Sequence, residues 1–89
     1  MTQAAAQQVA LNVSTATAEL ITKILAYFPQ AQIRPRSAPL ADEDISLEAM
    51  LPLTMPEIYQ ARDRIYDIVI ELQERYDLII LVSAIPQEG

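Results

Sequence analysis

The sequence predicts a small α/β domain in which two main helices pack against a three-stranded mixed sheet, in the order helix, strand, strand, helix, strand. Apolar residues recur at helical spacing in two segments, and three shorter segments have the composition of strands. The second helical segment joins the last two strands. This order suits the crossover connection of an α/β sheet that is covered by helices.

The length and composition indicate one domain with a high apolar content. The chain has 89 residues, of which 52% are hydrophobic. A chain of this size buries only roughly 60–65% of the surface that its unfolded form exposes. The apolar content therefore predicts either a dense core or apolar surface that a partner covers. We place the domain at residues 14–86, after a flexible or helical N-terminal arm over 1–13 and before a tail over 87–89.

The first helix is predicted from Ala16 to Phe28. Ser14 or Thr15 can cap its N-terminus, and Pro29 ends it. Two strands follow, at 31–34 and 45–53. The segment between them contains two prolines and reads as a loop, and Pro52 lies near the end of the second strand, where proline is tolerated.

A capping box predicts the start of the second helix. Thr54 and Glu57 have the spacing at which each side chain bonds the backbone N–H of the other residue. The helix continues to about Arg75 with an apolar stripe at Ile58, Ile65, Val69, Leu72 and Tyr76. The nearly continuous apolar segment 77–82 then predicts a strand that is buried on both faces.

Charge and composition exclude several classes of site. The chain has no cysteine and no histidine, so it has no disulfide, no thiolate nucleophile and no histidine metal ligand. With twelve acidic residues against six basic ones, it does not form a broad phosphate-binding face, and we do not expect a nucleic-acid partner. No segment approaches the ~20 apolar residues that span a bilayer. We expect a cytoplasmic protein without a membrane partner.

The acidic segment 42–48 is the candidate site. From Asp44 the residues alternate, so that Asp44, Ser46 and Glu48 share one face of the predicted strand. Neighbours on one face lie about 7 Å apart at ~3.3 Å rise per residue. Two carboxylates in that arrangement can hold a divalent cation against a triphosphate, but one of the two places is a serine. The segment is either a nucleotidyl-transfer site or its disabled remnant.

Over roughly Ala18 to Pro86 the chain resembles the minimal nucleotidyltransferases of the DNA polymerase β superfamily. Residues 33–38, Ile-Arg-Pro-Arg-Ser-Ala, fall where that family has Phe-Gly-Ser-Arg-Ala-Arg. Residues 42–47, Asp-Glu-Asp-Ile-Ser-Leu, fall where it has its acidic loop and Asp-Ile-Asp-Leu. The helix over 64–76 is similar to its Arg-x-Tyr-Asp-Leu-x-x-Glu-Leu-Glu helix, which is the closest part of the match.

The chain departs from this family at the residues that would bind nucleotide. The family's glycine-serine turn brings backbone donors against the phosphates, whereas this chain has Arg34 and Pro35 there, followed by Arg36. These three residues are a remnant turn or an anion site.

The acidic residues depart from the family as well. Asp44 matches the first acid, and Ser46 replaces the second. The other register, which pairs Ser46 and Glu48 with the family's acids, also loses one. Asp77 serves as a third acid only if it lies within the last strand and points toward Asp44.

The resemblance therefore implies a catalytically degenerate domain that binds proteins and no cofactor. Its partner would be a helical HEPN-type protein, as in two-component toxin–antitoxin-like systems, or further copies of the chain in a homo-oligomer. The expected interface is the side of the long helix that carries Tyr59, Tyr66 and Tyr76. The alternative is an active nucleotidyltransferase in which Asp44, Glu48 and Asp77 hold Mg²⁺ in a rearranged site. A third interpretation is an unrelated small α/β domain.

Overall fold

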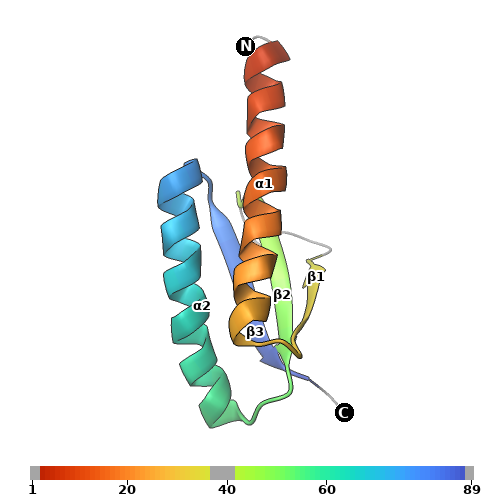
Figure 1. Ribbon diagram of the computed structural model, residues 1–89, viewed down its shortest axis with the longest axis vertical. Coiled ribbons are helices and arrows are strands. Elements are labelled where there is room, and N and C mark those ends of the chain that lie inside the picture. Colours follow the sequence, from red (N-terminus) through yellow and green to blue (C-terminus); the bar gives the residue numbers. More distant parts are fainter. Residues whose placement is uncertain (1–2, 37–41, 88–89) are drawn as a thin grey trace.

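The computed structural model describes residues 3–36 and 42–87, with side chains from residue 10 onward. Its elements are α1 (Gln3–Tyr27), β1 (Gln32–Pro35), β2 (Ile45–Leu51), α2 (Met55–Tyr76) and β3 (Ile80–Pro86). Figure 1 shows the two helices packed beside a three-stranded sheet. This arrangement confirms the predicted fold class and element order.

The sheet is mixed, and β2 is its central strand. β1 pairs with β2 in antiparallel orientation, which places Arg34 opposite Glu48. β3 pairs with the other side of β2 in parallel orientation, from Ile45 opposite Ile80 to Leu51 opposite Pro86. Because β2 and β3 are parallel, α2 is the crossover that the sequence predicted.

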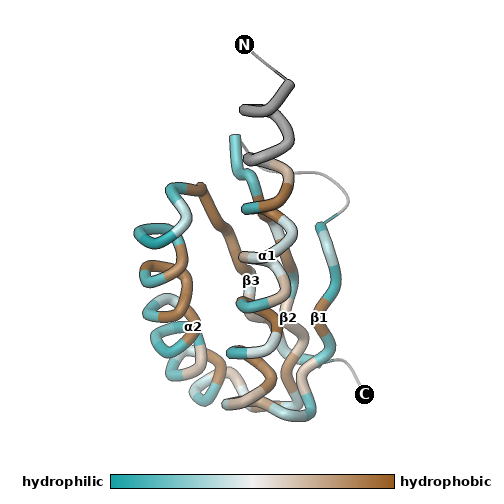
Figure 2. Tube along the Cα trace, turned by 45° about the horizontal axis from the view of Figure 1, so that its top comes forward, coloured by the Kyte–Doolittle hydropathy of each residue, from teal (hydrophilic) through white to brown (hydrophobic). Residues whose placement is uncertain are grey.

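One face of the sheet packs against both helices and forms the core. Along β2, fully buried residues alternate with partly exposed ones. The buried positions contact the apolar sides of the helices, which are coloured brown in Figure 2. Residues that are completely buried come from β2 and from both helices: Ala16, Leu20, Ile24, Ala49, Leu51, Ile58 and Leu72. Four of the five residues in the apolar stripe predicted for the long helix, Ile58, Ile65, Val69 and Leu72, are buried, and Tyr76 is partly buried.

The first helix is longer than predicted, since α1 begins at Gln3 rather than at a cap at Ser14 or Thr15. The arm at residues 1–13 is therefore helical from Gln3 and continuous with the helix of the domain. The alanine and glutamine residues before Ser14 have good helix propensity. Hydroxyl residues also fit inside this helix, because Thr17 Oγ1 donates to the Val13 carbonyl at 2.7 Å.

The last strand also differs from its prediction. Residues 77–79 precede β3, which runs from Ile80 to Pro86. Asp77 is the C-cap of α2, with the left-handed backbone conformation (φ 54°, ψ 47°) that ends many helices. The prediction of a strand buried on both faces was wrong, because no described element covers the second face. Leu81 and Ile85 are partly exposed there.

The start of α2 agrees with the sequence. The Glu57 carboxylate accepts hydrogen bonds from the Thr54 N–H at 3.0 Å and from Thr54 Oγ1 at 2.7 Å. Since Thr54 has extended backbone, this contact fixes where the chain leaves the loop after β2 and enters the helix.

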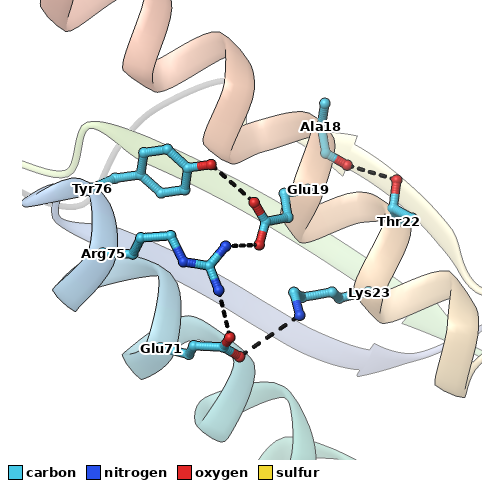
Figure 3. A network of polar contacts seen from close by, with 7 residues as sticks. All are labelled: Ala18, Glu19, Thr22, Lys23, Glu71, Arg75 and Tyr76. Carbon is cyan, nitrogen blue, oxygen red and sulfur yellow. Dashed lines mark hydrogen bonds and ion pairs between the residues drawn. The ribbon is translucent and has the colours of Figure 1, made fainter.

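A polar network joins the two helices along their exposed sides (Figure 3). Tyr76 Oη donates to Glu19 Oε1 at 2.9 Å, and Arg75 forms an ion pair with the same carboxylate. Arg75 also pairs with Glu71 at 2.6 Å, and Lys23 lies 3.8 Å from Glu71. Exposed ion pairs contribute little individually. The network links the end of α2 to the middle of α1.

The hydrogen bond from Tyr76 and the Arg75 guanidinium hold the pKa of Glu19 below its ordinary value of 4.5. A carboxylate whose pKa is lower in the folded state stabilises the fold above its unfolded pKa. That contribution is lost as the pH falls through the lower, folded value. Glu19 therefore stabilises the protein at neutral pH and ceases to do so in acid.

We predict that Tyr76→Phe lowers the free energy of unfolding at neutral pH, because the variant loses the hydrogen bond to Glu19. The difference from the parent should shrink as the pH falls below 4.5 and Glu19 becomes protonated. Urea denaturation at a series of pH values measures both effects. Tyr66→Phe, at an exposed tyrosine of the same helix, is the matched control. A Tyr76→Phe difference that stays constant with pH would contradict the role of Glu19.

Candidate functional site

The candidate site lies on the open face of the sheet, which we define as the face opposite the helices. The register of the strands places the following residues on this face: Gln32, Arg34, Ser46, Glu48, Met50, Leu81, Ser83 and Ile85. Ser46 and Glu48 share it, as their alternation in the sequence predicted. The residues in the middle of this face are polar, and Leu81, Met50 and Ile85 surround them.

Asp44 lies before β2 and ties the start of that strand to the start of β3. Its Oδ2 accepts a hydrogen bond from the Ile79 N–H at 2.8 Å, and its own N–H donates to the Ile79 carbonyl at 2.8 Å. The carboxylate that matches the family's first acid therefore caps the backbone of the neighbouring segment. This contact resembles the capping of turns by aspartate.

Two arginines of the predicted remnant turn reach the polar centre of the open face. Arg34 Nη2 pairs with Glu48 Oε2 at 3.2 Å across β1 and β2. The Arg36 N–H donates to the Ser46 carbonyl at 3.0 Å, which places Arg36 beside Ser46. From there Arg36 Nη1 donates to Ser83 Oγ on β3 at 2.8 Å. The Arg36 side chain thus spans the open face from one edge strand to the other.

Ser46 itself has a buried hydroxyl on the open face. Its Oγ makes no hydrogen bond to any described residue. A buried polar atom without a partner is destabilising, so it marks a position where the fold gains nothing from the serine. Ser46 stands where the resemblance expects the second acid.

The remaining acidic candidate does not join this group. Asp77 lies at the end of α2, outside β3, so the condition set for a third acid is not met. On β3 the residue opposite Glu48 is Ser83. Among the described residues no cluster of three acidic, histidine or cysteine side chains could hold a metal ion. Asp44, the metal candidate, therefore belongs to no such cluster of three among the described residues.

The three tyrosines predicted as an interface do not form one surface. Tyr59 and Tyr66 are 58% and 64% exposed, and they lie seven residues apart on α2. Tyr76 is partly buried and its hydroxyl bonds Glu19 of α1. The exposed pair remains available to a partner, whereas Tyr76 belongs to the contact between the helices.

Sequence reasoning missed the link from Arg36 to Ser83. The two residues are far apart in the sequence, and only the registers of β1 and β3 on β2 bring them together. The polarity of Ser83 within the otherwise apolar β3 was the available signal. Ser37 and Ala38 of the compared motif lie outside the described residues.

Comparisons with known proteins add no assignment. A scan against family models finds no match, and searches of curated proteins and of solved structures find no significant match. Within residues 3–36 and 42–87, neither helix has the length and apolar content needed to cross a membrane.

We predict that Ser46→Ala leaves the free energy of unfolding unchanged or raises it by up to about 1 kcal/mol, because the removed hydroxyl has no partner. Ser83→Ala is the matched variant, since it removes a hydroxyl that accepts from Arg36. It should lower the free energy of unfolding by about 0.5–1.5 kcal/mol. Urea denaturation distinguishes the two. A loss above about 1 kcal/mol for Ser46→Ala would show that its hydroxyl has a partner.

Proposed function

We propose that this chain is a nucleotidyltransferase-like domain without transfer activity that acts as a protein-interaction module in the cytoplasm. One observation carries the proposal: the carboxylates that would bind metal are already used inside the chain. Asp44 accepts from the Ile79 N–H, and Glu48 pairs with Arg34. Two-metal phosphoryl transfer needs carboxylates that are free to hold cations and to align the reacting oxygens.

The arginines support the same conclusion. In the family that the chain resembles, metal ions would lie beside the acids of the second strand. Here Arg36 places a guanidinium across that region, beside Ser46 and Ser83. A fixed positive charge disfavours a second cation at short distance. Pro35, in place of the turn residue that approaches phosphate, supplies no N–H donor.

The exposed apolar residues support a role in binding proteins. Several large apolar side chains are more than half exposed: Leu11, Tyr27, Tyr59, Tyr66 and Ile79. Scattered apolar residues are ordinary on a protein surface, but Tyr59 and Tyr66 project from one side of α2. We infer that a partner covers this side. The resemblance suggests a helical HEPN-type protein of a toxin–antitoxin-like pair, or a second copy of the chain.

Nucleotide binding tests the absence of catalysis. We predict no Mg²⁺-dependent nucleotidyl transfer and no measurable binding of ATP with Mg²⁺ by calorimetry, because the Asp44 and Glu48 carboxylates both have partners within the chain. A micromolar complex that requires Mg²⁺ and is weakened by Asp44→Asn would overturn the proposal. The matched control is Asp42→Asn, which neutralises an exposed acid in the same segment. A Mg²⁺-dependent complex that Asp44→Asn weakens and Asp42→Asn does not would favour an active enzyme in which Asp44 and Glu48 hold Mg²⁺.

Light scattering over a concentration series tests self-association. We predict a mass above that of the 9.9 kDa monomer, because the chain exposes apolar residues on α2 and β1 is an edge strand of the sheet. Tyr66→Lys should return the mass toward the monomer if this side of α2 forms the contact, since the change counts twice in a symmetric dimer. A monomeric mass up to high micromolar concentration would leave only a partner of different sequence.

A further inference from the structure

β3 forms one edge of the sheet. The backbone N–H and C=O groups of its successive residues point alternately toward β2 and away from it. The Ile79 carbonyl accepts from the Ile45 N–H, and the Gln87 N–H donates to the Leu51 carbonyl, so the odd-numbered residues bond to β2. The backbone groups of Ile80, Val82 and Ala84 therefore point away from the sheet. This outward row is the outer edge of β3.

Side chains of α2 close both ends of the outer edge. Gln73 Oε1 accepts a hydrogen bond from the Ile80 N–H at 2.9 Å. Three turns earlier on α2, Arg62 Nε and Nη2 donate to the Ala84 carbonyl at 3.2 and 3.0 Å. Beyond Ala84, Pro86 has no N–H to offer. The ends of β3 are thus protected against pairing with another strand.

The middle of the outer edge has no such protection. Within residues 3–36 and 42–87, no partner satisfies the Ile80 carbonyl, the Val82 N–H and carbonyl, or the Ala84 N–H. Along the strand these groups form the alternation of acceptors and donors that an added strand bonds. Between the two side-chain caps there is room for a short extended segment only.

A groove of about 320 Å³ runs between α2 and this edge. Its walls include Tyr66, Val69 and Ile70 of α2 and Leu81 and Val82 of β3. Tyr66 is 64% exposed at the rim. An extended segment beside Val82 would direct alternate side chains toward this apolar wall.

The charge beside the groove is negative. Three exposed acids without an ion-pair partner among the described residues follow the solvent side of α2: Asp63, Asp67 and Glu74. Arg64 stacks on Tyr27 and Arg75 pairs with Glu19, both away from the groove, whereas Arg62 lines one end of the groove and donates to the Ala84 carbonyl. A segment with basic residues would therefore complement this rim.

We propose that the outer edge of β3 binds a short, basic, extended segment of a protein partner as an added strand, with an apolar side chain in the groove. The proposal deepens the proposed function, on which it rests, by assigning a surface and the chemistry of the segment that it accepts. The backbone groups of Val82 would supply the central hydrogen bonds. The side chains of α2 would supply the selectivity.

A second copy of the chain does not fit this edge. Neighbouring strands lie about 4.8 Å apart, whereas packed helices need 8–10 Å between their axes. α2 lies on the outer side of β3 (Figures 1 and 2), and its side chains reach over the strand. A symmetric pairing of β3 with its own copy would force two α2 helices, with their acidic rims, into the same space.

The experiment is a nuclear magnetic resonance titration of ¹⁵N-labelled full chain with the capped peptide Lys-Val-Lys-Val-Lys. We expect saturable shifts centred on the Val82 and Ala84 amides, the free donors of the edge. The matched probe carries an N-methyl group on its central lysine and cannot donate there. It should bind about tenfold more weakly or worse.

Charge variants provide the second arm of the experiment. Asp67→Lys at the rim should weaken the peptide about threefold or more, whereas Asp42→Lys, which reverses an exposed acid before β2, should leave its affinity unchanged. The amide spectrum of each variant verifies that it is folded.

The proposal is overturned by the absence of saturable shifts, by shifts centred on the open face or on β1, or by equal affinity for the two peptides. Shifts of Val82 and Ala84 that depend on protein concentration without peptide would identify a second copy as the occupant and also overturn it. A negative peptide titration does not contradict the proposed function, because that function is contradicted only by Mg²⁺-dependent nucleotide binding.

Discussion

The burial of one face of β2, the central strand of the sheet, against both helices is the constraint on which the rest of the structure depends. Its alternate residues, from Ile45 to Leu51, face the helices and are buried, so the residues between them must face the other way. A shift of one residue in register would exchange the two sets. The apolar pattern of the strand therefore determines which side chains reach the open face, Ser46 and Glu48 among them.

The polar groups of the open face are arranged for internal contacts. Arg34 neutralises Glu48, Arg36 bonds Ser83, and Asp44 caps the start of β3. A catalytic site for phosphoryl transfer requires the opposite arrangement, with carboxylates held close together and free to bind cations. The same sheet can carry either arrangement, so the fold gives no information about activity and the side chains decide it.

Much of the fold follows from local sequence, whereas the site depends on pairing. The apolar period identified α2, and the spacing of Thr54 and Glu57 located its start. Alternation showed that Ser46 and Glu48 share a face, because that property is local to one strand. The contact between Arg36 and Ser83 depends on the registers of three strands, which no local pattern gives. The predicted start of α1 was wrong. Ser14 can cap a helix, but the residues before it also have good helix propensity, and the helix continues through it.

The position of β2 at the centre of the sheet has a consequence for synthesis. Its antiparallel neighbour β1 precedes it, but its parallel neighbour β3 comes last among the described elements, after the whole of α2. On the ribosome, β2 therefore has an unpaired edge and part of its apolar face uncovered until the crossover helix and β3 have emerged. Parallel strands joined across a helix form contacts that are distant in sequence, and such contacts are slow to form. This interval is when the nascent chain is most exposed to aggregation.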